Sequence, residues 1–151
     1  MTLGGTIFHH EEFVFKDGEI GNKLLVLLNT PHKNEPYLIV KTTSQDKGKP
    51  KNIGCIEKLS LFFVPPGPHF FSQPTWIQLH EIYEFSHQEF KADSRFKTMG
   101  SLNAKLLKEI IDCIFISQPD DILPTHENLL RPPLEKSLQK LKERFQKKVL
   151  I

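Results

Sequence analysis

The chain has 151 residues and a net charge of +2, with 38% hydrophobic and 25% charged residues. This length fits about one domain, and the composition is that of a globular protein with a buried core. No apolar run approaches the ~20 residues of a transmembrane helix, and residues 1–13 lack the basic start and the apolar stretch of a signal peptide. We therefore expect a cytoplasmic protein without a membrane segment.

The sequence contains only two cysteines, Cys55 and Cys113, and no CxxC motif. Two cysteines do not make a disulfide framework or a zinc site with paired ligands. We expect both to be partly buried free thiols, as is usual in a reducing cytoplasm.

The hydrophobic pattern predicts several strands followed by helices. Asp17-Gly18 marks a turn after the first strand, residues 45–52 read as a loop, and residues 65–68 are a proline-rich turn or sheet edge. Together the strands predict a mainly β protein, either a small barrel or a strongly curved sheet, with C-terminal helices. The predicted strands are residues 8–15, 23–29, 37–43, 59–64 and 75–85.

The period changes to three or four residues between Leu102 and Phe115, which predicts one amphipathic helix that ends before Pro119. We divide the chain into a domain over residues 1–117, a proline-containing linker over 118–131, and a basic amphipathic helix over 132–151. Residues 131–151 hold seven Lys or Arg residues and two Glu residues. The last segment either packs on the domain or a dimer mate, or serves as an arm for nucleic acid or a partner.

Common catalytic and cofactor motifs are absent from the sequence, among them a glycine-rich phosphate loop in its strand–helix context, HExxH and GxSxG. His9 and Glu11 share one face of the first strand, where they could hold a metal ion. A solvated strand end is the simpler interpretation, so we predict no metal site and no cofactor.

Hydroxyl groups and lysines gather at the end of the strand over residues 37–43. Thr42, Thr43 and Ser44 are followed by three lysines at alternating positions, Lys47, Lys49 and Lys51. Hydroxyl and ammonium groups are typical contacts of a phosphodiester backbone. A solubilising surface loop explains the same pattern without a ligand.

The strand over residues 75–85, TWIQLHEIYEF, alternates between apolar and polar residues. Alternation predicts that Trp76, Gln78 and His80 share one face and that Glu81 points to the other. This face is either the solvated side of a sheet or the floor of a reactive groove.

In their order, these segments resemble the MazF/PemK family of toxin–antitoxin toxins. The resemblance covers about two thirds of the chain. It implies a small SH3-like barrel, usually a homodimer, that acts without metal as an endoribonuclease and is inhibited by an antitoxin. The segments are GNKLLVLL (21–28), VKTTSQ (40–45) with the following lysine loop, WIQLHEI (76–82), and GSL (100–102) with the helix after it.

The resemblance assigns possible roles residue by residue. Thr43 and Ser44 stand where the family has its strand hydroxyl, and Lys23 stands where it has an arginine. Gln78 and His80 occupy the places of a family arginine and aspartate. The resemblance therefore implies a catalytic set of His80, Thr43, Lys23 and Gln78. Expected RNA contacts are Ser44, Lys41, Lys47, Lys49, Lys51 and Trp76.

Two functions follow as hypotheses. The first is a toxin-like endoribonuclease in which the 2′-OH of RNA attacks the neighbouring phosphate, with His80 as the acid–base group. The second is a catalytically silent member of the fold that binds nucleic acid or a partner protein, because Gln78 cannot stabilise negative charge as arginine does. An unrelated β-rich domain is the third possibility.

Overall fold

A computed structural model describes residues 2–67 and 71–132 of the chain. The chain divides into two compact units, residues 1–121 and 122–151. The described part of the second unit holds one short helix, α3 (Pro124–Leu130), with proline in its first turn, where proline is well tolerated. This helix lies inside the predicted linker. The predicted basic helix lies outside the described residues, apart from Pro132.

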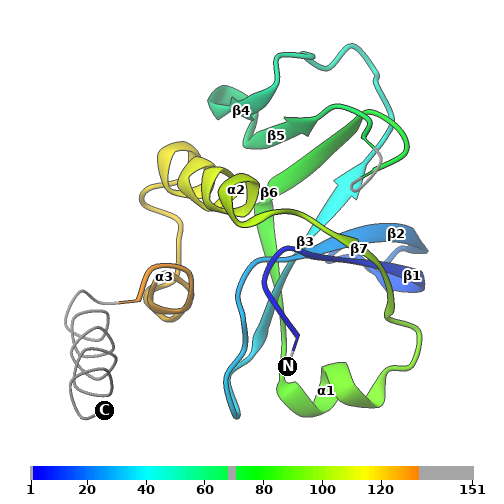
Figure 1. The fold of residues 1–151 in the computed structure, drawn as a ribbon, viewed down its shortest axis with the longest axis vertical. Coiled ribbons are helices and arrows are strands. Elements are labelled where there is room, and N and C mark those ends of the chain that lie inside the picture. Colours follow the sequence, from blue (N-terminus) through cyan, green and yellow to red (C-terminus); the bar gives the residue numbers. More distant parts are fainter. Residues whose placement is uncertain (1, 68–70, 133–151) are drawn as a thin grey trace, which may run out of the picture. The chain divides into compact units, whose positions relative to one another are not determined.

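The first unit is built on one sheet of seven strands, in which every printed pairing is antiparallel. Its order is β4-β5-β6-β3-β2-β1-β7 (Figure 1). The mainly β prediction is confirmed. In the described chain β4 and β7 are the two edges of this sheet, so the sheet is not closed into a barrel. The strands are β1 (Thr6–Val14), β2 (Ile20–Leu27), β3 (Tyr37–Thr43), β4 (Gly54–Ile56), β5 (Leu61–Val64), β6 (Thr75–Phe85) and β7 (Lys97–Ser101).

The predicted strands agree best with the structure where the sequence alternates over many residues. The predictions for β3 and β6 match their observed bounds, and the expected helix is α2 (Ala104–Ser117). The sequence analysis missed β4, β7 and the helix α1 (His87–Ala92). These elements have three to six residues, and β7 exposes most of its residues, so none shows a hydrophobic period.

Helix α1 is fixed at its start by a reciprocal cap. The Ser86 hydroxyl accepts a hydrogen bond from the Glu89 amide at 3.0 Å, and the Glu89 carboxylate accepts one from the Ser86 amide at 2.9 Å. This capping box satisfies two amides that have no partner within a helix. It allows a six-residue helix to begin directly after β6.

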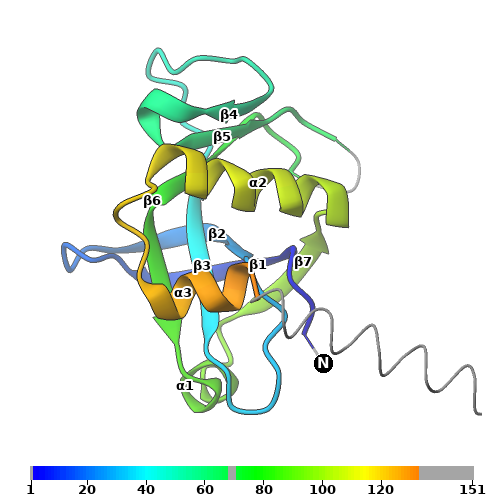
Figure 2. The same ribbon diagram turned by 90° about the vertical axis from the view of Figure 1, so that its left-hand side faces the viewer.

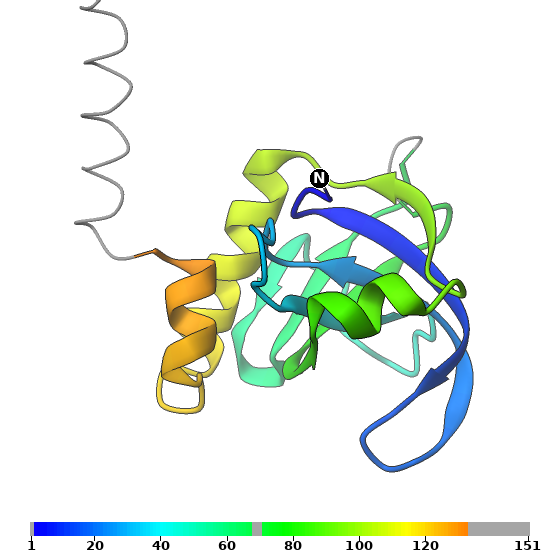
Figure 3. The same cartoon turned by 90° about the horizontal axis from the view of Figure 1, so that it is seen from below.

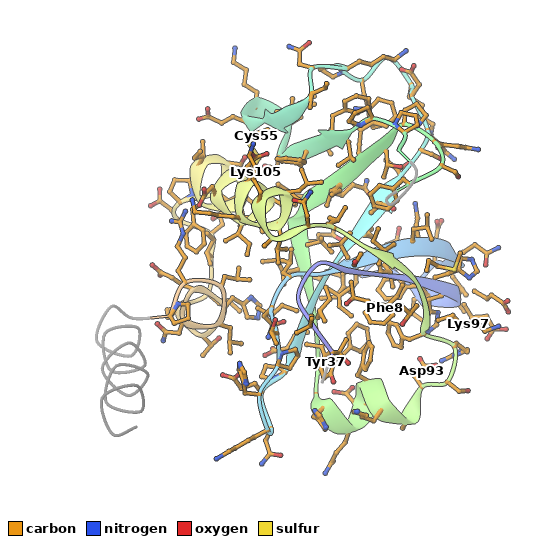
Figure 4. The ribbon with its side chains drawn as sticks, in the orientation of Figure 1. Phe8, Tyr37, Cys55, Asp93, Lys97 and Lys105 are labelled. Atoms are coloured by element: carbon orange, nitrogen blue, oxygen red, sulfur yellow. A yellow bond between two sulfur atoms is a disulfide. The ribbon has the colours of Figure 1, made fainter. Side chains whose placement is uncertain are left out.

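One face of the sheet packs its apolar side chains beneath α1. Tyr37 of β3 stacks on Phe90 of α1 with ring centroids 4.1 Å apart, and Phe8 of β1 meets the same ring edge-on at 5.1 Å. Figure 4 shows Phe8 and Tyr37 between the sheet and this helix. We call this group the α1 cluster. Its buried members are Phe8, Phe13, Leu25, Leu27, Tyr37, Ile39 and Tyr83.

Helix α2 packs on β4, on the short 3-10 helix η1 (Glu57–Leu59) and on β5. Figure 2 shows it running across the strands at this end of the sheet. Asn103 caps its start, because the Asn103 side-chain oxygen accepts a hydrogen bond from the Leu106 amide at 2.8 Å. The side chains that it buries are Ile110, Cys113 and Ile114.

A disulfide joins Cys55 of β4 to Cys113 of α2, so the prediction of two free thiols was wrong. The cysteines lie 58 residues apart in sequence, but the packing of α2 on the sheet edge brings their Cα atoms to 5.5 Å. That separation lies within the range that a disulfide spans. Sequence spacing could not reveal this contact. Figure 4 labels Cys55 beside α2.

A buried histidine ties β1 to the segment after α1. The His10 Nδ1 atom accepts a hydrogen bond from the Glu12 amide at 3.2 Å, so Nε2 donates to the Asp93 carboxylate at 2.9 Å. Arg95 Nε also donates to Asp93, at 2.9 Å. The Arg95 guanidinium, with a smaller contribution from His10, holds the pKa of the Asp93 carboxyl well below its usual range.

The hairpin between β1 and β2 extends away from the rest of the sheet, as Figure 3 shows. Its outermost pair, Val14 and Ile20, are cross-strand partners and both are exposed. Phe15 follows this pair and packs on Phe13 of the α1 cluster, with ring centroids 5.9 Å apart.

Among the described residues, no helix is long and apolar enough to cross a membrane.

Replacing both cysteines tests the contribution of the disulfide. We expect the Cys55→Ser/Cys113→Ser variant to lose about 2–4 kcal/mol of unfolding free energy, because the cross-link restricts the unfolded chain. Urea denaturation of the oxidised protein, the reduced protein and the double variant measures the change. Equal midpoints for the oxidised and reduced wild type would contradict the expectation.

Acid denaturation tests the Asp93 network. A folded-state pKa that is lowered adds stability above the unfolded pKa of about 4, and this stability is lost as the pH falls further. We expect Asp93→Asn to remove about 1–2 kcal/mol at neutral pH, a value reduced for solvent screening at the half-exposed Arg95. Asp120→Asn is the matched control. A pH–stability curve unchanged by Asp93→Asn would count against the network.

Candidate functional site

Strand register brings four of the predicted site residues together in two pairs. Lys41 of β3 stands opposite Gln78 of β6, and Thr43 stands opposite Trp76. Cross-strand partners share a face of the sheet. This face also carries the α1 cluster, because Lys41 pairs with Leu25 on its other side. Alternation predicted that Trp76 and Gln78 share a face, and the register adds Thr43 and Lys41 to that face.

The polar residues of this face lie between two apolar clusters. The α1 cluster forms one side, and the smaller cluster of Leu61, Phe63 and Trp76, with Ile56 packed on it, forms the other. Gln78 pairs with Leu61 on β5 and with Lys41 on β3, so it stands at the boundary. The apolar packing of this face is therefore interrupted by polar side chains at Lys41 and Gln78.

Three lysines gather along this boundary, and we call Lys23, Lys41 and Lys49 the lysine strip. The ammonium groups of Lys41 and Lys23 lie 5.2 and 5.6 Å from the centroid of the Phe15 ring. Lys49 lies 5.9 Å from the ring centroid of Trp76. Each therefore holds a cation–π position, which keeps the charged ends near the sheet.

The charges of the strip act on one another. Partial burial lowers the pKa of Lys23, and the positive charges of Lys41 and Lys49 lower it further. The Lys23 ammonium donates a hydrogen bond to the carbonyl oxygen of Thr42 at 3.1 Å. Because repulsion between like charges disfavours the charged form, a bound anion would stabilise all three ammonium groups. The strip therefore has the electrostatics of an anion site.

A break in register changes the direction of the residues after Gln78. Lys41 pairs with Gln78 and Ile39 pairs with Tyr83, so five steps along β6 match two along β3. Extra residues of this kind form a bulge. As a result Tyr83 reaches the α1 cluster on the same face as Gln78. Strict alternation would have placed it on the other face.

The bulge also brings Glu81 to the lysine strip. One Glu81 carboxylate oxygen lies 3.6 Å from the Lys41 ammonium and accepts a hydrogen bond from the Tyr83 hydroxyl at 3.0 Å. The other carboxylate oxygen lies 3.7 Å from Nε2 of His80. Alternation predicted that Glu81 points away from Gln78, but the bulge gives it Lys41, the partner of Gln78, as its neighbour.

His80 stands at the outer end of this chain of contacts, and its side chain is 46% exposed. Its link to Lys41 runs through Glu81. The three side chains form a row of imidazole, carboxylate and ammonium groups that solvent can reach at the imidazole end. These are the group types that exchange protons or stabilise charge near neutral pH.

Other predicted residues have different surroundings. Trp76 is 1% exposed, and its indole N–H donates to the carbonyl oxygen of Pro50 at 2.8 Å, so it is a core residue. Lys51 pairs with Asp46 at 2.8 Å, and Lys47 is exposed with φ +43°. Thr43, at the end of β3, and Ser44, which follows it, line a pocket together with Lys23.

Gln78 is the least expected member of the site. Its side-chain oxygen is buried and has no hydrogen-bond partner among the described residues. A buried acceptor without a partner costs free energy. Gln78 at this position therefore lowers the stability of the fold. The described residues include no group of three or more histidine, cysteine or acidic side chains that could hold a metal ion.

Sequence reasoning missed Glu81 and Phe15. The bulge that turns Glu81 towards Lys41 leaves no mark in an alternating sequence. Phe15 ends the sequence EEFVF and read as an ordinary strand residue. In the structure its ring lies near the ammonium groups of both Lys23 and Lys41. The signal that could have been used is the excess of aromatic residues near the turn, with Phe13 and Phe15 on one face.

Comparison with models of known protein families and with curated protein sequences gave no match for this chain.

The position of Glu81 is testable by titrating the tyrosines. Burial raises the pKa of Tyr83 to about 12, and the hydrogen bond to the Glu81 carboxylate adds to the increase. We expect Glu81→Gln to lower this pKa, because the negative acceptor beside the phenol is lost. Ultraviolet difference spectra against pH measure it, with Glu57→Gln as control. An unchanged Tyr83 titration would show that the two groups do not interact.

Proposed function

We propose that this protein is a toxin-like, metal-independent endoribonuclease with the SH3-like architecture of the MazF/PemK family. The observation that carries the proposal is the meeting of the lysine strip with the Lys41–Glu81–His80 row on one face of the sheet. RNA offers a phosphodiester for the lysines and a 2′-OH for the acid–base pair. Support for the family comes from the sequence resemblance and the mainly β sheet.

The reaction needs three actions from the protein. A base removes the proton of the 2′-OH, whose oxygen attacks the adjacent phosphorus. Positive charge stabilises the pentacoordinate phosphorane, and an acid protonates the departing 5′-oxygen. The products are a 2′,3′-cyclic phosphate and a free 5′-hydroxyl. No step uses water or a metal ion.

The residues of the row divide these tasks. Glu81 and His80 supply a carboxylate and an imidazole 3.7 Å apart, one to accept the first proton and the other to donate the second. Lys41, 3.6 Å from Glu81, stabilises the phosphorane, and Lys23 holds the flanking phosphate. Thr43 and Ser44 continue the phosphate path at the end of β3. Gln78, the cross-strand partner of Lys41, orients the ribose.

A second candidate is RNA binding without cleavage. Glu81 is already engaged by Lys41 and by the Tyr83 hydroxyl, and both contacts weaken a carboxylate as a base. Lysine also lacks the bidentate geometry with which arginine holds a phosphate. These two observations favour a module that binds RNA on the same strip and leaves it intact.

The partners and location remain part of the proposal. An antitoxin peptide across the lysine strip and a homodimer follow from the resemblance, and a cytoplasmic location follows from the sequence pattern and the two cysteines. The disulfide bears on the last point, since disulfides are uncommon in a reducing cytoplasm. Alkylation of thiols in lysed cells under acid quench measures its state directly.

An assay on a labelled RNA in EDTA separates the two candidates. We expect cleavage to a 2′,3′-cyclic phosphate, with His80→Ala lowering the rate by about 10²- to 10⁴-fold, as loss of an acid–base group does. Lys41→Ala should weaken RNA binding and reduce the salt dependence of affinity by about one unit. Gel analysis of the products and fluorescence anisotropy are the measurements.

The matched controls are His32→Ala, in an exposed loop, and Lys108→Ala, on the exposed side of α2. Binding that depends on Lys41 without any cleavage would support the silent module and exclude the enzyme. A wild-type protein that neither binds nor cleaves RNA would contradict both candidates.

A further inference from the structure

A polar pocket beside the lysine strip is lined by residues from both faces of the sheet, with Lys23 and Thr43 from the face of the strip. Leu24 precedes Leu25, and Thr42 follows Lys41, so both point away from the strip. Leu24 pairs with His9 of β1, and the Thr42 hydroxyl donates to the carbonyl oxygen of Leu24 at 2.7 Å. The pocket has a volume of about 320 Å³. It is lined by His9, Asn22, Lys23, Leu24, Thr42, Thr43, Ser44, Gln45 and Thr75.

The hydroxyl groups of three lining threonines already have partners. Thr42 donates to Leu24, Thr75 donates to the carbonyl oxygen of Gln73 at 2.9 Å, and the Thr43 hydroxyl accepts from the Gln45 amide at 3.2 Å. These bonds hold the pocket wall in one shape. A wall fixed by its own hydrogen bonds can present the remaining groups without rearranging.

The other polar side chains of the pocket are available to a ligand. Within the described residues, the side chains of Asn22, Ser44 and Gln45 form no hydrogen bond or ion pair, and all three are exposed. Two carboxamides and a hydroxyl offer donors and acceptors in equal measure. None of the nine described lining residues is acidic, and Leu24 adds an apolar surface.

This chemistry suits a flat ligand with a polar edge and no charge of its own. Carboxamide side chains of Asn and Gln pair with the donor and acceptor groups on the edges of nucleobases. Sequence-specific RNA recognition uses unpaired bases splayed away from the strand. A phosphate would instead need positive charge, which this pocket has only at its border with Lys23.

The pocket and the lysine strip meet at the end of β3. The Lys49 ammonium donates to the carbonyl oxygen of Gln45 at 2.8 Å, and the Lys23 ammonium donates to that of Thr42 at 3.1 Å. Two residues that line the pocket therefore bind two lysines of the strip through their backbones. A strand whose phosphate lies on the strip can turn a neighbouring base over this edge.

We propose that the pocket lined by Asn22, Ser44 and Gln45 is a binding site for one unpaired nucleobase of an RNA strand held on the lysine strip. The inference rests on RNA binding in the proposed function and adds base selectivity to it. Cleavage is not required, so the site serves the enzyme and the silent module alike.

Binding of short 2′-O-methyl oligonucleotides tests the site, because these strands cannot react through their 2′ position. Fluorescence anisotropy gives the Kd for four homopolymers and for an abasic strand of the same length. We expect the wild type to prefer its best homopolymer over its worst by about 5- to 150-fold, the discrimination of a well-paired base. Asn22→Ala and Gln45→Ala should bring this ratio close to one.

The variants are surface changes, and Asn34→Ala in an exposed loop is the matched control. Lys41→Ala should weaken all strands equally and leave the ratio unchanged. The inference is overturned if Asn22→Ala and Gln45→Ala leave the ratio as in the wild type, or weaken the abasic strand as much as the others. Failure of every strand to bind wild type would overturn the proposed function itself.

Discussion

The bulge in β6 is the constraint on which the rest of the site depends. Without it, Tyr83 would point away from the α1 cluster, and Glu81 would point away from Lys41. With it, one strand can contribute Trp76 and Tyr83 to two separate apolar clusters on the same face. The residues between them, from Gln78 to Glu81, are left with polar neighbours. The polar row is thus a by-product of how the two clusters are packed.

This arrangement gathers positive charge on one face and lowers the folding stability of the protein. Lys23, Lys41 and Lys49 repel one another, and Glu81 neutralises only part of their charge. The buried Gln78 oxygen without a partner adds a further cost. The aromatic rings of Phe15 and Trp76 reduce this cost by holding ammonium groups over their faces. Sites with such local conflicts are commonly functional rather than structural.

Much of the framework could be predicted from the sequence. Long strands with regular alternation and a long amphipathic helix each show a clear hydrophobic period. The bounds of β3 and β6 match for this reason. The elements that were missed, such as β7 and α1, are too short to carry a period. Strand β7 forms by pairing with β1, which is distant in sequence, whereas α1 carries a local signal in the Ser86–Glu89 capping box that the hydrophobic period does not report.

The site was predictable only in part, and for a similar reason. Alternation placed Trp76 and Gln78 on one face, where the register has them beside Thr43 and Lys41. It could not show that Glu81 approaches Lys41, because this contact depends on the bulge. Nor could it show that the Trp76 indole is buried against the loop carbonyl of Pro50, which is distant in sequence. The disulfide was hidden in the same way, because it joins a sheet edge to a helix that packs on it.

The bond between Cys55 and Cys113 also turns the middle of the chain into a covalent ring. The ring contains β5, β6, α1 and β7, and therefore every acid–base residue of the proposed site. The lysine loop and the pocket residues of β1, β2 and β3 lie outside it, on the N-terminal side. A single proteolytic cut between residues 55 and 113 would leave both fragments joined. A cut between residues 44 and 54 would release the N-terminal part from the ring.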